Sequence, residues 1–228
     1  MRSLSRRPVV GLSIAVAALA LVTTTAASLQ QRHPVSGRRI ADVMGHQGAA
    51  WLERAEREAE EAPSKAIAAL NIRAGHVIAD IGAGSGYYSV RLAKAVGPTG
   101  RVYATDIQPE MLALLKRKID RDELSNIELI LGGETDTRLP DNSIDLAILV
   151  DVYHELSQPQ AFLKSVRRAL KKDGRLVLVE FRKEDPRVPI LEEHKMSVRE
   201  ARMELEAEGF VFDRLIDVLP WQHILIFR

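Results

Sequence analysis

The sequence predicts an α/β fold in which helices cover both faces of a mostly parallel, Rossmann-like sheet of seven strands. Apolar segments of strand length alternate with amphipathic helical segments from residue 76 to residue 181, as in a parallel sheet with crossover helices. Residues 77–86 read Val-Ile-Ala-Asp-Ile-Gly-Ala-Gly-Ser-Gly, a buried strand that enters a glycine-rich turn. Segments 210–218 and 222–228 are joined by too few residues for a crossover, so they predict a C-terminal antiparallel hairpin.

Each strand and helix of this fold has its own signal in the chain. Strands are expected at 76–81, 101–106, 127–131, 144–150, 175–181, 210–218 and 222–228, with helices at 87–96, 109–121, 159–171 and 198–208. Ahead of the sheet, residues 49–61 predict one charged helix, and Pro63 begins a second helix that runs to Leu70. These two helices would cap the sheet.

The glycine-rich turn predicts a site for an adenosine-containing ligand. Gly82, Gly84 and Gly86 occupy alternate positions after Asp80, at the place where an open α/β sheet binds such ligands. Because glycine has no Cβ, the backbone can take a positive φ and lie directly against a flat ligand. The dinucleotide-binding fingerprint requires glycine at position 87, and this chain has Tyr87 there. The alternative interpretation is an ordinary strand-to-helix turn that binds nothing.

Asp106 is a further candidate for this ligand. It ends the strand expected at 101–106, about 20 residues beyond the last glycine, where a carboxylate can accept hydrogen bonds from both ribose hydroxyls. Asp106 can also cap the helix that begins near Pro109, and the two roles are compatible. Its spacing from the glycine turn and its place at a strand end favour the ribose role.

With these motifs the chain resembles the class I S-adenosylmethionine-dependent methyltransferases over roughly residues 70–228. The stretch Leu-Pro-Asp-Asn-Ser-Ile-Asp at 139–145 is similar to the one before the fourth strand in quinone-biosynthesis C-methyltransferases. The resemblance implies S-adenosyl-L-methionine as the cofactor and methyl transfer to a small or lipid-like acceptor. It also implies an acid at the adenine edge, Glu134 ahead of Asp136, although either can be a solvated turn acid. Tyr87 is a candidate contact for the cofactor's carboxylate.

Asp151 and His154 are the candidate catalytic residues, because they follow the fourth strand at the edge where ligands enter such sheets. Methyl transfer from a sulfonium requires an in-line arrangement, and it requires a base only where the acceptor must lose a proton. His154 can be that base, oriented by Glu155 or Asp151, while Asp151 can also contact the methionine end of the cofactor or the substrate. Residues 180–185 lack the Asp-Asn pair of metal-dependent O-methyltransferases, so no metal is expected.

The composition limits the class of protein and its partners. Of 228 residues, 46% are hydrophobic and 28% are charged, as in soluble globular proteins, and the formal net charge is +1. A charge so close to zero gives no general attraction to nucleic acid, so no nucleic-acid partner is expected. The methyltransferase resemblance implies a small-molecule or lipid-like partner instead. The chain has no cysteine, which excludes disulfides, a thiol nucleophile and a Cys-based zinc site.

Residues 1–28 predict a signal peptide or a membrane anchor. The start is basic, residues 9–27 are apolar or small, and Thr25-Ala26-Ala27 suits a signal peptidase. The protein is therefore expected to be exported to the periplasm or anchored in the membrane. The expected organisation is a signal or anchor at 1–28, a linker at 29–44, a helical cap at 45–72 and a methyltransferase domain at 73–228.

Two other functions are compatible with the sequence. A non-catalytic nucleoside-binding module of the same fold would explain the export segment and the lack of a compelling base. An NAD-dependent oxidoreductase would share the parallel sheet, but Tyr87 and the terminal hairpin both argue against it.

Overall fold

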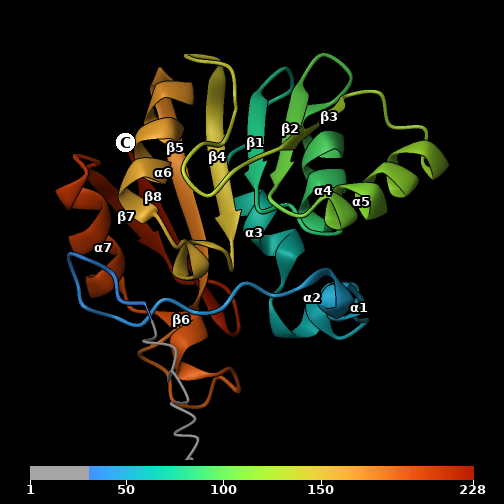
Figure 1. The fold of residues 1–228 in the computed structure, drawn as a ribbon. Helices are drawn as coiled ribbons and strands as arrows, with labels where there is room; N and C mark the ends of the chain where they lie inside the picture. Colours follow the sequence, from blue (N-terminus) through green and yellow to red (C-terminus); the bar gives the residue numbers. More distant parts are fainter. Residues whose placement is uncertain (1–30) are drawn as a thin grey trace, which may run out of the picture.

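One sheet runs through the part of the chain that the computed structural model describes, residues 31–228 (Figure 1). Its strands lie in the order β3-β2-β1-β4-β5-β8-β7, and β6 pairs with β5 off this path. The strands are β1 (Val77–Ile81), β2 (Arg101–Asp106), β3 (Ile127–Leu131), β4 (Ile144–Val150), β5 (Leu170–Arg182), β6 (Lys195–Met196), β7 (Phe212–Ile216) and β8 (Gln222–Phe227).

The pairing confirms the predicted mixture of parallel and antiparallel strands. β1 pairs parallel with both β2 and β4, so the order of strands reverses there and leaves a crevice at their carboxyl ends. β8 pairs antiparallel with β5 and with β7, which is the predicted terminal hairpin. A dinucleotide-binding fold lacks such a hairpin, so the observed topology favours the methyltransferase resemblance over the oxidoreductase alternative.

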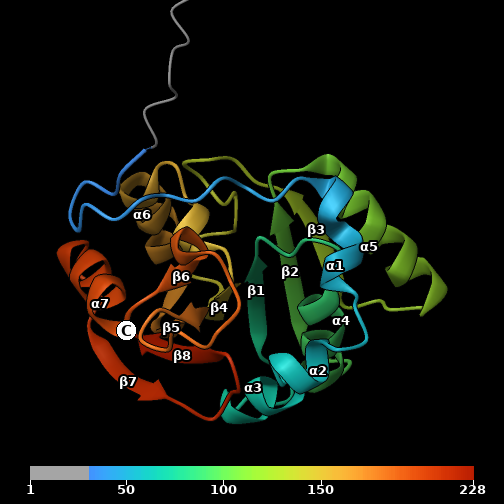
Figure 2. The same ribbon diagram turned by 90° about the horizontal axis from the view of Figure 1, so that it is seen from below.

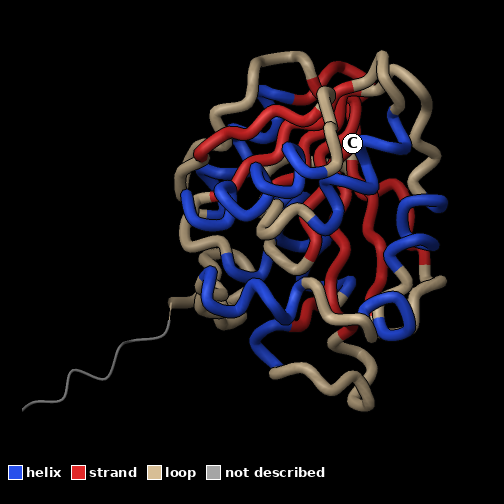
Figure 3. The backbone as a smooth tube through the Cα atoms, turned by 90° about the vertical axis from the view of Figure 1, so that its right-hand side faces the viewer, coloured by secondary structure: helices blue, strands red, loops and turns tan. Residues whose placement is uncertain are grey.

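Helices cover both faces of the sheet, as predicted (Figure 3). Apolar residues of α3 and α4 pack on one face, and those of α6 and α7 pack on the other. Successive residues of the central strands alternate between these two apolar layers. The helices are α1 (Ala49–Leu52), α2 (Arg57–Glu60), α3 (Pro63–Ala69), α4 (Tyr87–Val96), α5 (Pro109–Arg121), α6 (Pro159–Ala169) and α7 (Val198–Ala207), with short 3₁₀ turns η1 (His46–Gly48), η2 (Tyr153–Glu155) and η3 (Glu192–His194).

The cap differs from its prediction. The single helix expected at 49–61 is two short helices, α1 and α2, separated by a turn at residues 53–56. The Arg57 guanidinium donates to the carbonyl of Leu52 at 2.9 Å, and in a continuous helix that carbonyl would accept from the backbone of residue 56. Arg57 is buried and also forms an ion pair with Glu61 at 2.7 Å. In the turn at residues 53–56, the Arg57 side chain thus replaces a hydrogen bond that a continuous helix would make through its backbone.

One strand begins earlier than predicted, and one short strand was not predicted. β5 begins at Leu170, so the preceding helix ends at Ala169, two residues before its expected end. The short strand β6 was not expected, because two residues carry no period-2 signal; its pairing with Phe181 and Arg182 comes from the loop that follows β5.

Residues 31–44, here called the strap, pack against the domain in the region expected to be a linker. They run past α6 to α1 across the ends of the strands (Figure 2). A hairpin-like bridge joins Arg32 to Arg39, and Ile40 and Ala41 are buried. The buried Arg38 pairs with Glu204 of α7 at 2.8 Å, so an ion pair fixes the strap on the domain.

Within the described range, no helix combines the length and the apolar character needed to cross a membrane. The predicted signal or anchor at 1–28 lies outside the described residues.

Candidate functional site

A cavity of about 620 Å³ lies at the carboxyl ends of β1, β2, β4 and β5. Its walls include residues at the ends of these strands (Ile81, Asp106, Val150 and Phe181), the strap residues Asp42, Val43 and Met44, and Trp51 and Leu52 of α1. A cleft of this size at a topological switch point is where open α/β sheets bind nucleotide-like ligands. The position of the cavity therefore agrees with the site predicted from the glycine turn.

The three glycines of the turn do not share one role. Gly82 and Gly84 line the cavity, but Gly86 does not. A Cβ on Gly86, whose φ is 85°, would lie 2.2 Å from Cδ1 of Leu115, so this glycine allows α5 to pack against the turn. Only the first two glycines therefore lie where a ligand in the cavity can reach them.

Asp106 lies on the cavity wall beside the glycine turn. Its carboxylate accepts from the backbone N–H of Gly84 at 2.8 Å and from that of Gln108 at 2.8 Å. Burial raises the pKa of this carboxyl, and the two backbone hydrogen bonds oppose that shift. Gln108, not Asp106, is the N-cap residue of α5 and no side chain caps it, so the predicted capping role is wrong. The carboxylate oxygens retain further lone pairs for ribose hydroxyls.

Sequence reasoning missed Gln108. Its side-chain oxygen accepts from the backbone of His46 at 2.8 Å, and its side-chain nitrogen donates to the carbonyl of Met44 at 2.9 Å. These two bonds hold the end of the strap next to Asp106. No local pattern marks a glutamine for this role, because both of its partners lie more than 60 residues away.

Asp80 and Tyr87 do not border the cavity. Asp80 is buried under the turn and accepts from the Ser89 hydroxyl at 2.5 Å, and burial raises its pKa to about 6. The Tyr87 ring stacks against the Arg91 and Arg57 guanidinium groups at 3.6 and 4.4 Å. Both residues therefore support the turn from behind.

The two acids of the 132–136 loop lie in different places. Glu134 lines the cavity, where the Ser157 hydroxyl donates to it at 3.0 Å. Asp136 lies outside the cavity and accepts from the Ser165 hydroxyl at 2.9 Å and from the backbone of Arg138 at 2.8 Å. The structure thus leaves Glu134 as the acid that a ligand in the cavity can reach.

Asp151 presents a buried oxygen without a partner. It has a φ of 53°, unusual for a residue other than glycine, and it lines the cavity. Its Oδ2 accepts from the Gln222 amide at 2.6 Å, whereas Oδ1 has no hydrogen-bond partner among the described residues. Burial, followed by the Glu61 carboxylate, raises its pKa well above the ordinary value. A buried unpaired acceptor is costly, so this oxygen suits a donor brought by a ligand, such as the ammonium group of S-adenosylmethionine.

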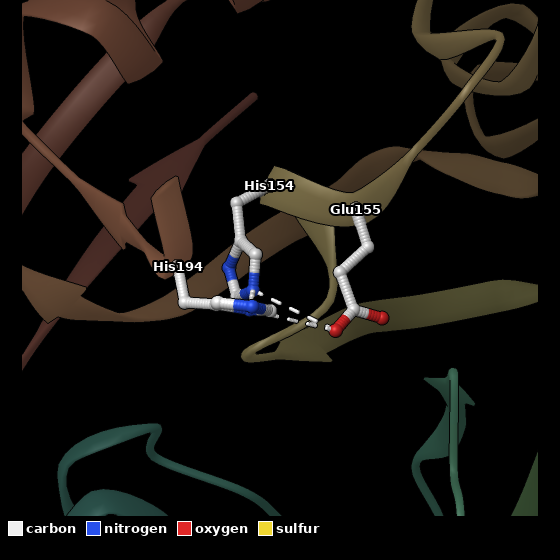
Figure 4. Close-up of side chains that lie close together, drawn as sticks. All are labelled: His154, Glu155 and His194. Atoms are coloured by element: carbon white, nitrogen blue, oxygen red, sulfur yellow. Dashed lines mark hydrogen bonds and ion pairs between the residues drawn. The ribbon is translucent and has the colours of Figure 1, made fainter. Parts of the chain in front are cut away.

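His154 lies on the cavity wall in η2, held by Glu180. Its Nδ1 is 2.6 Å from Oε2 of Glu180, so the orienting carboxylate is Glu180 rather than the expected Glu155 or Asp151. Burial lowers the pKa of His154 to about 4 and raises that of Glu180 to about 8. The other ring nitrogen, Nε2, is 3.1 Å from Nδ1 of His194 (Figure 4).

Glu180 and His194 were missed as site residues. Glu180 lies within β5 and His194 follows it by 14 positions, so neither has a sequence neighbour that signals chemistry. The β5–β6 pairing brings them together, because Lys195 lies opposite Phe181 and therefore places His194 near Glu180.

Comparisons with known proteins agree with this geometry. Residues 79–178 match the family model described as a methyltransferase domain. The ubiquinone/menaquinone biosynthesis C-methyltransferase UbiE of Pseudomonas putida is 33% identical over 113 residues, 49% of this chain and 44% of that protein. A demethylmenaquinone methyltransferase of a Geobacillus species is 30% identical over 111 residues, 49% of this chain and 47% of that protein. The matches thus span less than half the length of these relatives.

A solved structure matches more of the chain. A SAM-dependent methyltransferase from Aquifex aeolicus superposes with a TM-score of 0.77 at 28% identity, over 81% of this chain and 98% of that one. The residues that the family model matches include the glycine turn and Asp106. Residues 79–178 are therefore similar to a methyltransferase domain, and the chain shares its fold with a solved SAM-dependent methyltransferase.

Proposed function

We propose that this protein transfers the methyl group of S-adenosylmethionine to a small or lipid-like acceptor. The observation that carries the proposal is the position of the Asp106 carboxylate, 2.8 Å from the Gly84 backbone on the wall of a cavity at the switch point of the sheet. That pairing of an acid with bare backbone suits a ribose next to the turn.

Three acids would hold the cofactor along the cavity. Asp106 would accept from the ribose hydroxyls, Glu134 from the adenine amine, and the unpaired Oδ1 of Asp151 from the ammonium group of the methionine end. When bound, S-adenosylmethionine supplies an electrophilic methyl group. The task of these residues is to fix the methyl carbon in line with the acceptor atom.

The acceptor would occupy the apolar part of the cavity wall. Leu156, Phe162, Phe181, Ile190 and Leu191 line it, and they favour an apolar or ring-containing molecule over a charged one. One relative described above is named for ubiquinone/menaquinone biosynthesis and another for demethylmenaquinone, which supports a quinone-like acceptor. His154, which lines the cavity with Glu180 behind it, would face this acceptor and would accept a proton or fix the acceptor in place.

The variant His154→Ala is expected to lower turnover by about 100- to 10,000-fold, the usual contribution of a positioned acid or base. Binding of S-adenosylhomocysteine should stay within about twofold, because the three cofactor-binding acids are untouched. Turnover is measured as S-adenosylhomocysteine formed from S-adenosylmethionine with a panel of quinols, phenols and other apolar acceptors, and binding is measured by calorimetry.

His76→Ala is the matched control, because His76 precedes β1 at the end of the sheet opposite the cavity. Equal turnover in wild type and His154→Ala would remove His154 from the mechanism. Tight binding of S-adenosylhomocysteine without turnover of any acceptor would favour the non-catalytic nucleoside-binding module. Binding of NADH in place of S-adenosylhomocysteine would favour the oxidoreductase.

We propose further that residues 1–28 export the protein or tether it to the membrane. The basic start and the apolar stretch at 9–27 support this proposal. Fractionation of cells expressing the full chain should place it in the periplasm or the membrane, and removal of residues 1–28 should move it to the cytoplasm. Recovery of the full chain in the cytoplasmic fraction would contradict the proposal.

A further inference from the structure

Three side chains of types that can bind metals converge at one point of the cavity wall. His154 and Glu155 come from η2 and His194 comes from η3, and all three line the cavity (Figure 4). Nε2 of His154 is 3.1 Å from Nδ1 of His194, and Oε1 of Glu155 is 3.8 Å from each of these nitrogens. Their ligand atoms form the one group of this kind found among residues 31–228.

The spacing of these atoms fits a single cation. A triangle with these sides has its centre about 2.1 Å from each corner, which is the distance that Zn²⁺ keeps from histidine nitrogen and carboxylate oxygen. A simple hydrogen bond between the two histidines would explain the 3.1 Å separation alone. It would not explain why a carboxylate oxygen lies equally far from both nitrogens.

The surroundings of His154 resemble the outer shell of a metal site. Glu180 contacts Nδ1 of His154 at 2.6 Å, the arrangement in which a carboxylate fixes a histidine ring so that Nε2 faces the metal. The strap holds the same residue from the other side, since Arg38 and Ala41 donate to the His154 carbonyl at 3.0 and 3.1 Å. The first ligand is therefore fixed in place by its neighbours.

The unexpected strand β6 accounts for the position of the third ligand. It begins directly after His194 and pairs with β5, which carries Glu180. Without that pairing, the loop after β5 would have no backbone contact to hold His194 against His154. The two-residue strand β6 thus has a structural role if His194 must be held next to His154.

We infer that His154, Glu155 and His194 bind one divalent cation, Zn²⁺ by its preference for two nitrogens and one oxygen, at the acceptor end of the cavity. The expectation of no metal rested on a missing Asp-Asn pair and does not bear on this different set of ligands. A three-ligand site leaves at least one coordination position open, and all three ligands line the cavity. The open position would take a hydroxyl or thiol of an acceptor, and Nε2 of His154 would then be a ligand rather than a base.

The test uses the full chain, made without a polyhistidine tag, stripped with EDTA and dialysed. Added Zn²⁺ should be retained at one ion per chain by mass spectrometry of the metal content. Co²⁺ should give the visible absorption of a nitrogen- and oxygen-ligated site. His194→Ala and Glu155→Gln should each weaken Zn²⁺ binding by more than about 100-fold in competition with a chromophoric chelator, since loss of an outer-shell partner alone costs about 10- to 100-fold.

The control His76→Ala removes a histidine far from the cluster and should bind Zn²⁺ like the wild type. Failure to retain Zn²⁺, or equal affinity in the wild type and both ligand variants, would overturn the inference. The inference does not depend on methyl transfer, and calorimetry with S-adenosylhomocysteine on the same samples separates the two. A chain that binds S-adenosylhomocysteine but no Zn²⁺ would retain the proposed function and lose the metal site.

Discussion

Replacing Asp106 with alanine is expected to weaken binding of S-adenosylhomocysteine by about 100- to 10,000-fold. The carboxylate would accept two ribose hydroxyls, and each hydrogen bond to a charged group contributes about 1.5–3 kcal/mol. Calorimetric titration measures the change directly. The effect should fall on binding and not on the rate at saturating S-adenosylmethionine, because Asp106 lies on β2 and His154 follows β4.

Asp106 also accepts from the Gly84 and Gln108 backbones, so the alanine variant could loosen the turn as well as lose the ribose contact. Asp106→Asn separates these effects, because its amide oxygen can still accept one backbone hydrogen bond. Asp136→Ala is the matched control, since Asp136 is an acid in a nearby loop and Asp136 itself does not line the cavity. Unchanged affinity in Asp106→Ala, with the fold intact by thermal unfolding, would contradict the proposed cofactor site.

Local sequence signals predicted seven of the eight strands, and they placed Gly82, Gly84 and Asp106 at the edge of the sheet where the cavity lies. The strand at 101–106 and the helices at 87–96 and 109–121 have the predicted bounds, because each has a strong apolar period and a clear stop. Gly84 and Asp106 follow strands whose carboxyl ends must meet in a parallel sheet. Their contact at 2.8 Å therefore follows from topology that the sequence already predicts.

The half of the site around His154 depends on contacts between segments far apart in the chain. Glu180 reaches His154 from the neighbouring strand, His194 returns through β6, and Arg38 reaches the same turn from the strap. None of these contacts has a local period or motif. The predicted continuous helix at 49–61 failed for a more local reason, because the Arg57 guanidinium donates to the Leu52 carbonyl that residue 56 would bond in an unbroken helix.

The variant Glu204→Gln is expected to destabilise the folded protein by about 3–5 kcal/mol, the usual cost of leaving a buried charge without its partner. Glu204 is fully buried on α7, and its two oxygens accept from the Arg38 guanidinium at 2.8 and 3.1 Å. Glutamine keeps the shape of the side chain but removes its charge, so Arg38 would remain buried and unpaired. Urea unfolding of the full chain measures the loss.

Two further variants make this test specific to the buried pair. Glu206→Gln, on the same helix, breaks an exposed pair with Arg202 and should change stability by less than about 1 kcal/mol. The double variant Arg38→Met with Glu204→Leu should be more stable than Glu204→Gln, because it leaves no buried charge without its partner, even though His33 and Ser36 lose their contacts with Glu204. A Glu204→Gln variant as stable as Glu206→Gln would show that the strap is not fixed by this ion pair.

The strap reaches the His154 carbonyl through Arg38 and the cavity wall through Met44. Loss of the ion pair between Arg38 and Glu204 should therefore also lower turnover before the whole domain unfolds.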